Sequence, residues 1–357
     1  MSSIHEKKLF EYLDVVLAQG ATDLHINAKK PPMVRVDSIL YPIKDEKELT
    51  PTDTKELIFS LFSEDQKKRF SKNKELDFAY SHGDKARFRV NAFVQQGTYS
   101  AALRLIPHTI LSLQDLGLPE DITHFTDQQQ GFVLVVGPTG HGKTTTLASM
   151  VNVINETRSD HIITIEDPIE YIFPQLKGLI AQREVYHDTD SFENALKASL
   201  REDPNVVLVG EMRDLETIGS ALTLAETGHL VLSTLHTNDA SQTIDRIIDV
   251  FPPYQQNQVR VQLASTLKGI ISQRLIPKIG GGRIPAVEIL RSTSAVQNLI
   301  REGKTHQINN IIQTGAGEGM VPLNRSLTEL VKQKTITKEN ALFYSNNEDE
   351  LKGLIGK

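Results

Sequence analysis

The sequence predicts an α/β fold with a parallel sheet, preceded by a small α+β domain. In the second part of the chain, short apolar strands alternate with helical segments, which is the order of a parallel sheet with helices on both faces. A glycine-rich loop of phosphate-binding type joins the first of these strands to a helix-compatible run. The length of 357 residues exceeds what one hydrophobic core normally serves, so we expect two domains.

Residues 1–106 are the predicted α+β domain. Apolar residues near the N-terminus are spaced like one face of a helix, which Gly20 ends. The patterns that follow predict short helices at 57–62 and 66–70 and strands at 23–26, 33–36, 75–80, 86–94 and 99–106. Side chains alternate along a strand, so Arg87 and Arg89 share one face. Residues 107–115 show neither pattern and are the predicted linker.

Residues 116–357 are the predicted α/β domain. We expect helices notably at 191–200 and 215–226, and short apolar strands at 132–136, 161–165, 206–209 and 230–234. From about residue 259 onward we expect mostly helix, interrupted by a flexible loop at Gly280, Gly281 and Gly282. Ligands of such sheets bind beyond the carboxyl ends of the strands, and the candidate site residues lie there.

The loop from Gly137 to Thr144 is the strongest single signal, because it matches the pattern G-x-x-x-x-G-K-[ST] at every fixed position. Its glycines let backbone N–H groups point at an anion, and the following helix adds the positive end of its dipole. Lys143 can reach the β- and γ-phosphates of ATP, and the Thr144 hydroxyl can ligate Mg²⁺. A plain glycine turn is the alternative, which the flanking strand and helix disfavour. The candidate nucleotide-binding residues are Gly137, Pro138, Thr139, Gly140, His141, Gly142, Lys143, Thr144 and Thr145.

Two carboxylates follow the loop at the ends of later strands. The strand at 206–209 resembles a Walker B strand, which usually ends in Asp. Here Gly210 occupies that place, and Glu211 follows it. Glu211 can hold a water molecule on Mg²⁺, and Glu166 can orient and partly deprotonate the attacking water. Either residue alone could be a solvated acid in a turn, but both in this order favour a catalytic role. The division of roles between them stays open.

Two histidines bracket the strand at 230–235. A histidine at a strand end can sense the γ-phosphate through a hydrogen bond, and His236 is the candidate catalytic residue of this kind. A structural histidine is the alternative for both His229 and His236. Their spacing is not helical and the chain has no cysteine, so a zinc site is not expected.

The composition and the charge of the chain exclude several classes of function. The net charge of −6 gives no drive toward nucleic acid, so no nucleic-acid partner is expected. The absence of cysteine excludes disulfides and thiolate catalysis. The N-terminus lacks the apolar region of a signal peptide, and no apolar run reaches the roughly 20 residues that span a bilayer. We therefore expect a cytoplasmic protein that can dock on a membrane protein.

Together these motifs resemble the PilT family, the type IV pilus retraction ATPases of the secretion ATPase superfamily. The matching segments are 22–26, the Walker A loop at 137–144, an Asp box at 163–170, a Walker B region at 210–214, a His box at 228–238 and a retraction segment at 295–302. The resemblance implies a PAS-like N-terminal domain, a RecA-like P-loop ATPase domain and a homohexamer that hydrolyses ATP with Mg²⁺. It also implies pilus retraction (twitching motility), driven at the inner face of the cytoplasmic membrane through a PilC-like platform protein, with a PilU-like ATPase as a further partner.

A ring would give the arginines of the first domain a function. An arginine from one subunit can stabilise transition-state charge in the site of its neighbour. The resemblance places the segments that carry Arg89 and Arg104 near the nucleotide, which makes both candidate catalytic residues. Ordinary surface arginines are the alternative.

The chain departs from the family at a few positions and leaves other functions open. His141 stands where the family usually has Ser, and Val296 and Gln297 replace Ile and Arg in the retraction segment. The alternatives are the accessory retraction ATPase PilU and the pilus or type II secretion assembly ATPases, which are longer and usually carry four cysteines. A nucleic-acid translocase or a small-molecule kinase could use the same loop, but acidity disfavours the first and no acceptor pocket is evident for the second.

Overall fold

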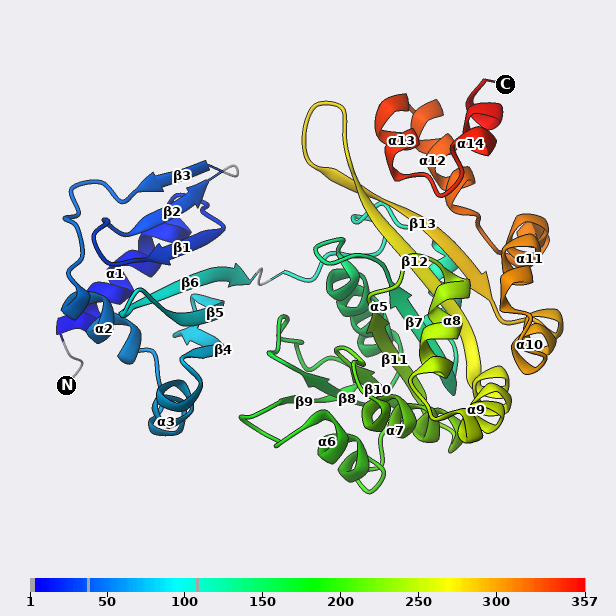
Figure 1. The fold of residues 1–357 in the computed structure, drawn as a ribbon, viewed down its shortest axis with the longest axis horizontal. Coiled ribbons are helices and arrows are strands. Elements are labelled where there is room, and N and C mark those ends of the chain that lie inside the picture. Colours follow the sequence, from blue (N-terminus) through cyan, green and yellow to red (C-terminus); the bar gives the residue numbers. More distant parts are fainter. Residues whose placement is uncertain (1–3, 37–38, 107–108, 357) are drawn as a thin grey trace. The chain divides into compact units, whose positions relative to one another are not determined.

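The computed structural model describes residues 4–36, 39–106 and 109–356, which form two compact units (Figure 1). The first comprises Met1–Thr109 together with Asp167–Ile172, and the second comprises Ile110–Glu166 and Phe173–Lys357. Pro107 and His108 of the predicted linker lie outside the described residues, and 109–115 form bends, turns and irregular backbone. The predicted fold class, an α/β domain preceded by an α+β domain, is confirmed.

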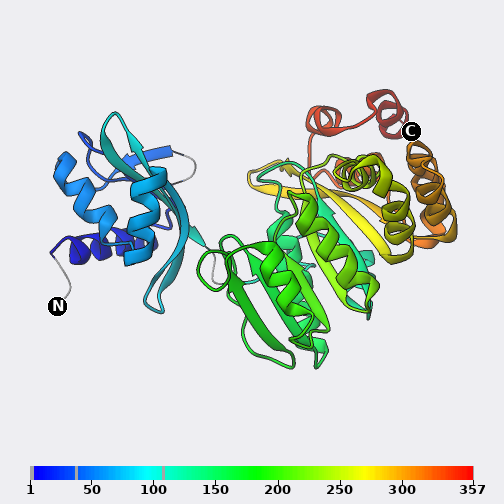
Figure 2. The same ribbon diagram turned by 60° about the horizontal axis from the view of Figure 1, so that its bottom comes forward.

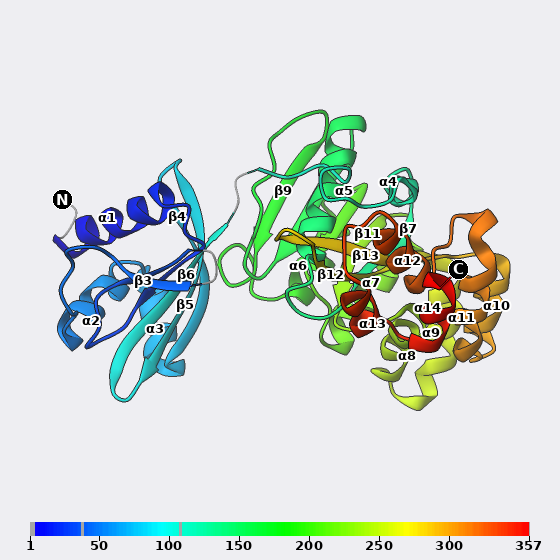
Figure 3. The same ribbon diagram turned by 90° about the horizontal axis from the view of Figure 1, so that it is seen from above.

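The first unit is a six-stranded antiparallel sheet in the order β3-β2-β1-β6-β5-β4. Its helices α1 and α2 pack on one face of the sheet, where Leu13, Leu24, Ile58 and Leu103 form a buried core (Figure 3). The elements are α1 (Ile4–Ala18), β1 (Asp23–Ile26), β2 (Met33–Val36), β3 (Ile39–Pro42), α2 (Pro51–Phe59), α3 (Glu64–Asn73), β4 (Glu75–His82), β5 (Ala86–Gln95) and β6 (Thr98–Ile106).

Capping explains where the two short helices begin. Thr50 accepts a hydrogen bond from the Asp53 N–H while the Asp53 carboxylate accepts one from the Thr50 N–H, so α2 starts at Pro51, six residues before the predicted start. Ser63 and Gln66 form the same reciprocal pair at the start of α3. Strand β3 was not predicted, because all four of its residues are exposed at the sheet edge and carry no burial pattern.

The second unit is built on a seven-stranded sheet in the order β13-β12-β7-β11-β10-β8-β9. Its strands run parallel except β13, which pairs antiparallel with β12. Helices α4 and α5 lie on one face and α7, α8 and α9 lie on the other (Figure 3). The elements are α4 (Thr123–Thr126), β7 (Gly131–Val136), α5 (Lys143–Thr157), β8 (His161–Glu166), β9 (Leu179–Glu184), α6 (Phe192–Ser199), β10 (Val206–Val209), α7 (Leu215–Glu226), β11 (Leu230–Leu235), α8 (Ala240–Asp249) and α9 (Pro253–Thr266).

The expectation that the chain is mostly helical from about residue 259 is wrong for its first part. After α9 ends, a long hairpin follows, made of β12 (Leu267–Pro277) and β13 (Arg283–Arg291). The glycine triplet at 280–282 lies in its turn, where all three glycines have positive φ. Strand β12 is an inner strand between β7 and β13, and the residues in its middle are buried at consecutive positions, so it lacks the alternation that signals a strand.

Helices complete the C-terminal part: α10 (Ser294–Arg301), α11 (Ile308–Thr314), α12 (Leu323–Lys332), α13 (Lys338–Tyr344) and α14 (Glu348–Ile355). Helix α10 buries Val296 and Ile300 in the main core, while Leu299 is partly buried against it. Helices α12 to α14, red in Figures 1 and 2, lie beside the yellow hairpin and share a small core with it. Within the described ranges, no helix is long and apolar enough to cross a membrane.

Candidate active site

The predicted phosphate loop connects β7 to α5 in a backbone conformation that requires glycine. Gly137, Gly140 and Gly142 have φ angles of 144°, 78° and 81°, which L-residues with a Cβ atom adopt only with strain. Gly142 is the N-cap of α5 and has no side chain to cap the first turn. No side chain at the N-cap therefore competes with an anion for the N–H groups at the start of α5.

Lys143 lies inside this loop. Its side chain is buried, and its Nζ atom donates hydrogen bonds to the carbonyl oxygens of Gly137 at 2.8 Å and Pro138 at 3.0 Å. The same atom lies 3.4 Å from Nδ1 of His236. The ammonium is thus held at the loop, where it can compensate the charge of a phosphate.

His236 connects the loop to the predicted acid Glu211. Its Nδ1 atom lies 3.3 Å from Oγ1 of Thr139, and its Nε2 atom lies 3.6 Å from Oε2 of Glu211. Glu211 also forms an ion pair with Arg213 at 2.5 Å. These residues follow β7, β11 and β10, which are adjacent in the sheet, so the parallel strands bring their ends to one edge.

Glu166 lies one strand further from the loop. It is the last residue of β8, its side chain is buried, and its Oε1 atom accepts a hydrogen bond of 2.7 Å from Thr164 Oγ1. The neighbouring β10 is followed by Gly210, where a Cβ atom would lie 3.4 Å from the Glu166 Cα atom. This is an ordinary contact distance, so the packing of the two strand ends does not require glycine at position 210.

Two histidines have structural contacts. His229 precedes β11 at the opposite edge of the sheet, and its Nδ1 atom donates to the Leu224 carbonyl oxygen at 2.9 Å. The His141 side chain turns toward the hairpin, where its Nδ1 atom accepts a 2.9 Å hydrogen bond from the Leu275 N–H. Burial, together with the nearby charges of Arg274 and Lys143, lowers the pKa of His141, which favours this neutral acceptor.

Sequence reasoning missed the contribution of the hairpin to the loop. Gln273 donates from its side-chain amide to the His141 carbonyl oxygen of the loop and accepts a hydrogen bond from Thr146 of α5, and Arg283 donates to the Gly140 carbonyl oxygen at 3.3 Å. The available signal was a glycine triplet between two apolar runs, which is typical of a β-hairpin.

The predicted arginines lie together in the first unit, whereas the phosphate loop lies in the second. Arg89 and Arg104 are directly opposite each other on β5 and β6, and Arg104 Nε donates to Asp23 Oδ1 at 2.9 Å. Burial opposes ionisation of Asp23, but hydrogen bonds from Thr22 and Arg104 keep the pKa of this carboxyl below its ordinary value. Arg89 forms a 3.3 Å ion pair with Glu170, and 42% of its side chain remains exposed. The two guanidinium groups therefore share one face of the sheet.

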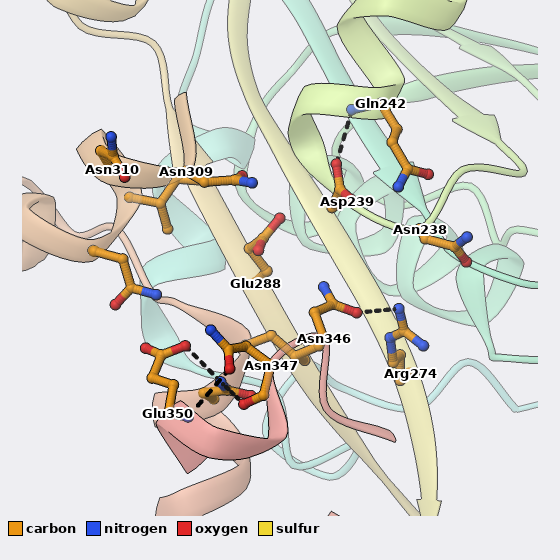
Figure 4. Close-up of a pocket in the computed structure, with 14 residues that line it drawn as sticks. Asn238, Asp239, Gln242, Arg274, Glu288, Asn309, Asn310, Asn346, Asn347 and Glu350 are labelled. Atoms are coloured by element: carbon orange, nitrogen blue, oxygen red, sulfur yellow. Dashed lines mark hydrogen bonds between the residues drawn. The ribbon is translucent and has the colours of Figure 1, made fainter. Parts of the chain in front are cut away.

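A polar pocket of about 690 Å³ lies between the start of α8, the hairpin and the C-terminal helices (Figure 4). Glu288 is buried in its wall, where its Oε1 atom accepts a hydrogen bond of 3.1 Å from the Ala240 N–H. Burial, with the nearby charge of Asp239, raises the pKa of Glu288 to about 7. On the other side, Arg274 donates to Asn346 at 2.8 Å, which joins the hairpin to the segment between α13 and α14.

The site has a glycine loop with a buried lysine between a parallel strand and a helix, and it has acids and a histidine at the ends of adjacent strands. These features define a P-loop nucleotide hydrolase. A family model described as Type II/IV secretion system protein matches residues 2–318. The chain is 48% identical over 334 residues to the type IV pilus retractation ATPase PilT of Pseudomonas aeruginosa. This match covers 93% of this chain and 96% of the relative. It is 39% identical over 344 residues to the type IV pilus ATPase PilU of the same organism, and this match covers 96% of this chain and 90% of the relative.

A solved structure agrees with these relatives. The crystal structure of the pilus retraction motor PilT with bound ADP matches with a TM-score of 0.90 and 48% identity, covering 96% of this chain and 98% of that chain. The chain therefore belongs to the type II/IV secretion system protein family, and it is an ATPase. The predicted resemblance to PilT is confirmed.

The elevated pKa of Glu288 predicts a pH-dependent stability. The folded pKa of about 7 lies above the ordinary value of 4.5, so the folded state binds more protons between these values and stability falls as the pH rises through this range. Glu288→Gln keeps an oxygen for the Ala240 N–H and removes the charge. It should increase the free energy of unfolding by about 1–3 kcal/mol at pH 8 and change it little at pH 4.5, measured by calorimetry.

Glu318→Gln is the matched control, because Glu318 is exposed. An equal gain for both variants, or an equal gain of Glu288→Gln at both pH values, would contradict the interpretation.

Proposed function

We propose that this ATPase is a homohexameric motor that powers type IV pilus retraction by acting on a PilC-like platform protein. The observation that carries the proposal is the contact of Lys143 and Thr139 with His236, which extends to Glu211, in a chain similar to a PilT over 93% of its length. Function at the inner face of the cytoplasmic membrane, with a PilU-like ATPase as a further partner, follows from the same proposal.

The residues present suit Mg²⁺ as the accompanying ion. Hydroxyl and carboxylate oxygens are the protein ligands that Mg²⁺ prefers, and Thr144 and Glu211 would supply them directly or through water. In the described ranges, no group of three or more His, Asp or Glu side chains could hold a metal by itself. The ion would also be bound by phosphate oxygens and water, and it would neutralise charge on the phosphates.

The remaining steps, phosphate binding and water activation, are carried out by side chains and N–H groups of the protein itself. The N–H groups at the start of α5 and the Lys143 ammonium stabilise charge on the β- and γ-phosphates. Glu166 orients the attacking water and accepts its proton, while His236 contacts the γ-phosphate and links it to Glu211. Arg89 and Arg104 act in the site of a neighbouring subunit.

The alternatives are less well supported. The identity of 48% to PilT against 39% to PilU favours the retraction motor over the accessory ATPase. A nucleic-acid translocase would be expected to carry a basic surface, whereas the net charge is −6. We therefore propose no nucleic-acid partner, and hydrolysis should not respond to added DNA.

Lys143→Ala tests the loop and the motor function together. Without the ammonium, phosphate charge is uncompensated, so ATP hydrolysis should fall at least about 10²-fold while the fold persists. The variant should also fail to restore twitching motility to a bacterium that lacks its retraction ATPase. Lys332→Ala, on the exposed face of α12, is the control and should behave like the unaltered chain. Hydrolysis by Lys143→Ala near the control rate would refute the role of the loop.

Glutamine substitutions separate the two acids. Glu166→Gln should retain ATP binding and trap unhydrolysed ATP, because the water is no longer activated. Glu211→Gln should weaken the Mg²⁺-dependent binding of ATP or also slow hydrolysis, with binding measured by titrating ATP at several Mg²⁺ concentrations. Trapping of ATP by Glu211→Gln together with normal turnover by Glu166→Gln would show that the roles are reversed.

Mixing subunits tests the arginines. Arg104→Ala or Arg89→Ala should lower turnover by about 10³-fold if the side chain acts on a neighbour's transition state. Mixing such a variant with Lys143→Ala should restore part of the activity, because some interfaces then contain both an intact loop and an intact arginine. A chain that carries both substitutions is the control and should restore none. No recovery after proven subunit exchange would exclude action between subunits.

A further inference from the structure

Gln273 is a buried polar residue of β12 whose side-chain amide forms hydrogen bonds with the phosphate loop and with the helix that follows it. Its Oε1 atom accepts a hydrogen bond of 2.8 Å from Thr146 Oγ1, in the first turn of α5. Its Nε2 atom donates a hydrogen bond of 2.9 Å to the backbone carbonyl oxygen of His141, within the loop. Since a carbonyl can only accept, the orientation of the amide is fixed. One side chain therefore joins the loop to the helix that follows it.

The backbone of Gln273 also limits the shape of the loop. Strand β12 pairs with β7, and Ser272 lies opposite Val136, the residue before the loop. A Cβ atom at Gly137 would lie 2.3 Å from the Gln273 carbonyl oxygen, and one at Gly142 would lie 3.0 Å from its Nε2 atom. The first and last glycines of the loop thus both pack on Gln273.

The Gln273 bond to Thr146 is buried, whereas the Gln273 bond to the His141 carbonyl is partly buried. Gln273 and Thr146 are 2% and 1% exposed, so the polar groups of this bond have no ready replacement in water. The Leu275 bond to His141 is partly buried, and the Arg283 bond to Gly140 is exposed. Loss of the Gln273 amide would leave a buried hydroxyl and a carbonyl unsatisfied on both sides of Lys143.

We propose that Gln273 is a positioning residue for the nucleotide, because its amide holds the phosphate loop and the first turn of α5 in the geometry that binds phosphate. The inference rests on the proposed binding of nucleotide by the loop. Gln273 itself touches no phosphate; it fixes the direction of the N–H groups that do. A phosphate site depends on the orientation of these groups, so small displacements weaken binding and slow hydrolysis.

Two substitutions remove the bond from opposite sides. Gln273→Leu removes the amide at similar volume, and Thr146→Val removes only the hydroxyl. Thr305→Val is the matched control, because Thr305 is also buried in the second unit and donates a 2.8 Å bond to a side-chain oxygen, that of Asp245. Affinity for a fluorescent ADP, kcat, KM and the melting temperature with and without ADP are measured for each.

The expected result separates positioning from stability. All three variants should melt at lower temperature, but only Gln273→Leu and Thr146→Val should bind ADP about tenfold more weakly and show a lower kcat/KM. Thr146→Ser keeps the hydroxyl and should restore affinity. The double variant should lose less affinity than the product of the two single losses, because both remove the same bond.

Gln273→Glu covers the case in which Gln273→Leu does not fold. It retains an acceptor for Thr146 but places an oxygen against the His141 carbonyl, so it should also weaken ADP binding. The proposal would be overturned if Gln273→Glu and Thr146→Val had an ADP affinity and a kcat/KM within twofold of those of Thr305→Val. Failure of the underlying loop assignment has a different signature, since Lys143→Ala would then hydrolyse ATP at the control rate.

Discussion

The close packing of the glycine loop on strand β12 is the constraint on which the active site depends. The loop backbone approaches the Gln273 carbonyl so closely that no side chain fits at Gly137. This approach leaves the carbonyls of Gly137 and Pro138 directed at the Lys143 ammonium and places Thr139 beside His236. The hairpin therefore contacts the proposed nucleotide site, although it lies about 130 residues further along the chain.

The parallel sheet then gathers the remaining groups. Strands β7, β11, β10 and β8 are successive neighbours, so the loop, His236, Glu211 and Glu166 appear in that order along one edge. Register has a similar effect in the first unit, where antiparallel pairing places Arg89 opposite Arg104 and Arg104 opposite Asp23. The candidate phosphate loop thus lies in one unit and the two candidate arginines, paired with Glu170 and Asp23, lie in the other.

Local sequence patterns were sufficient to predict strands that are buried along their length and end at a candidate site residue. Strands β7, β8, β10 and β11 are short buried runs that end at the loop, Glu166, Gly210 and His236, and they were predicted within a residue or two. The hairpin was missed because β12 is an inner strand with buried residues at consecutive positions, so its sequence lacks the alternation that signals a strand. Strand β3 was missed for the opposite reason, since it is exposed throughout. The role of Gln273 depends on Thr146, 127 positions away, and no local pattern could predict it.

A crystal structure of this chain with ADP and Mg²⁺ would show whether the loop packed on β12 binds the nucleotide. We expect the β-phosphate to lie in the loop at 137–144 and to accept hydrogen bonds from its N–H groups and from Lys143, while the Gln273 amide keeps its contacts with Thr146 and His141. A nucleotide bound away from the loop, or a phosphate bound in the loop while the Gln273 contacts are broken, would contradict this expectation.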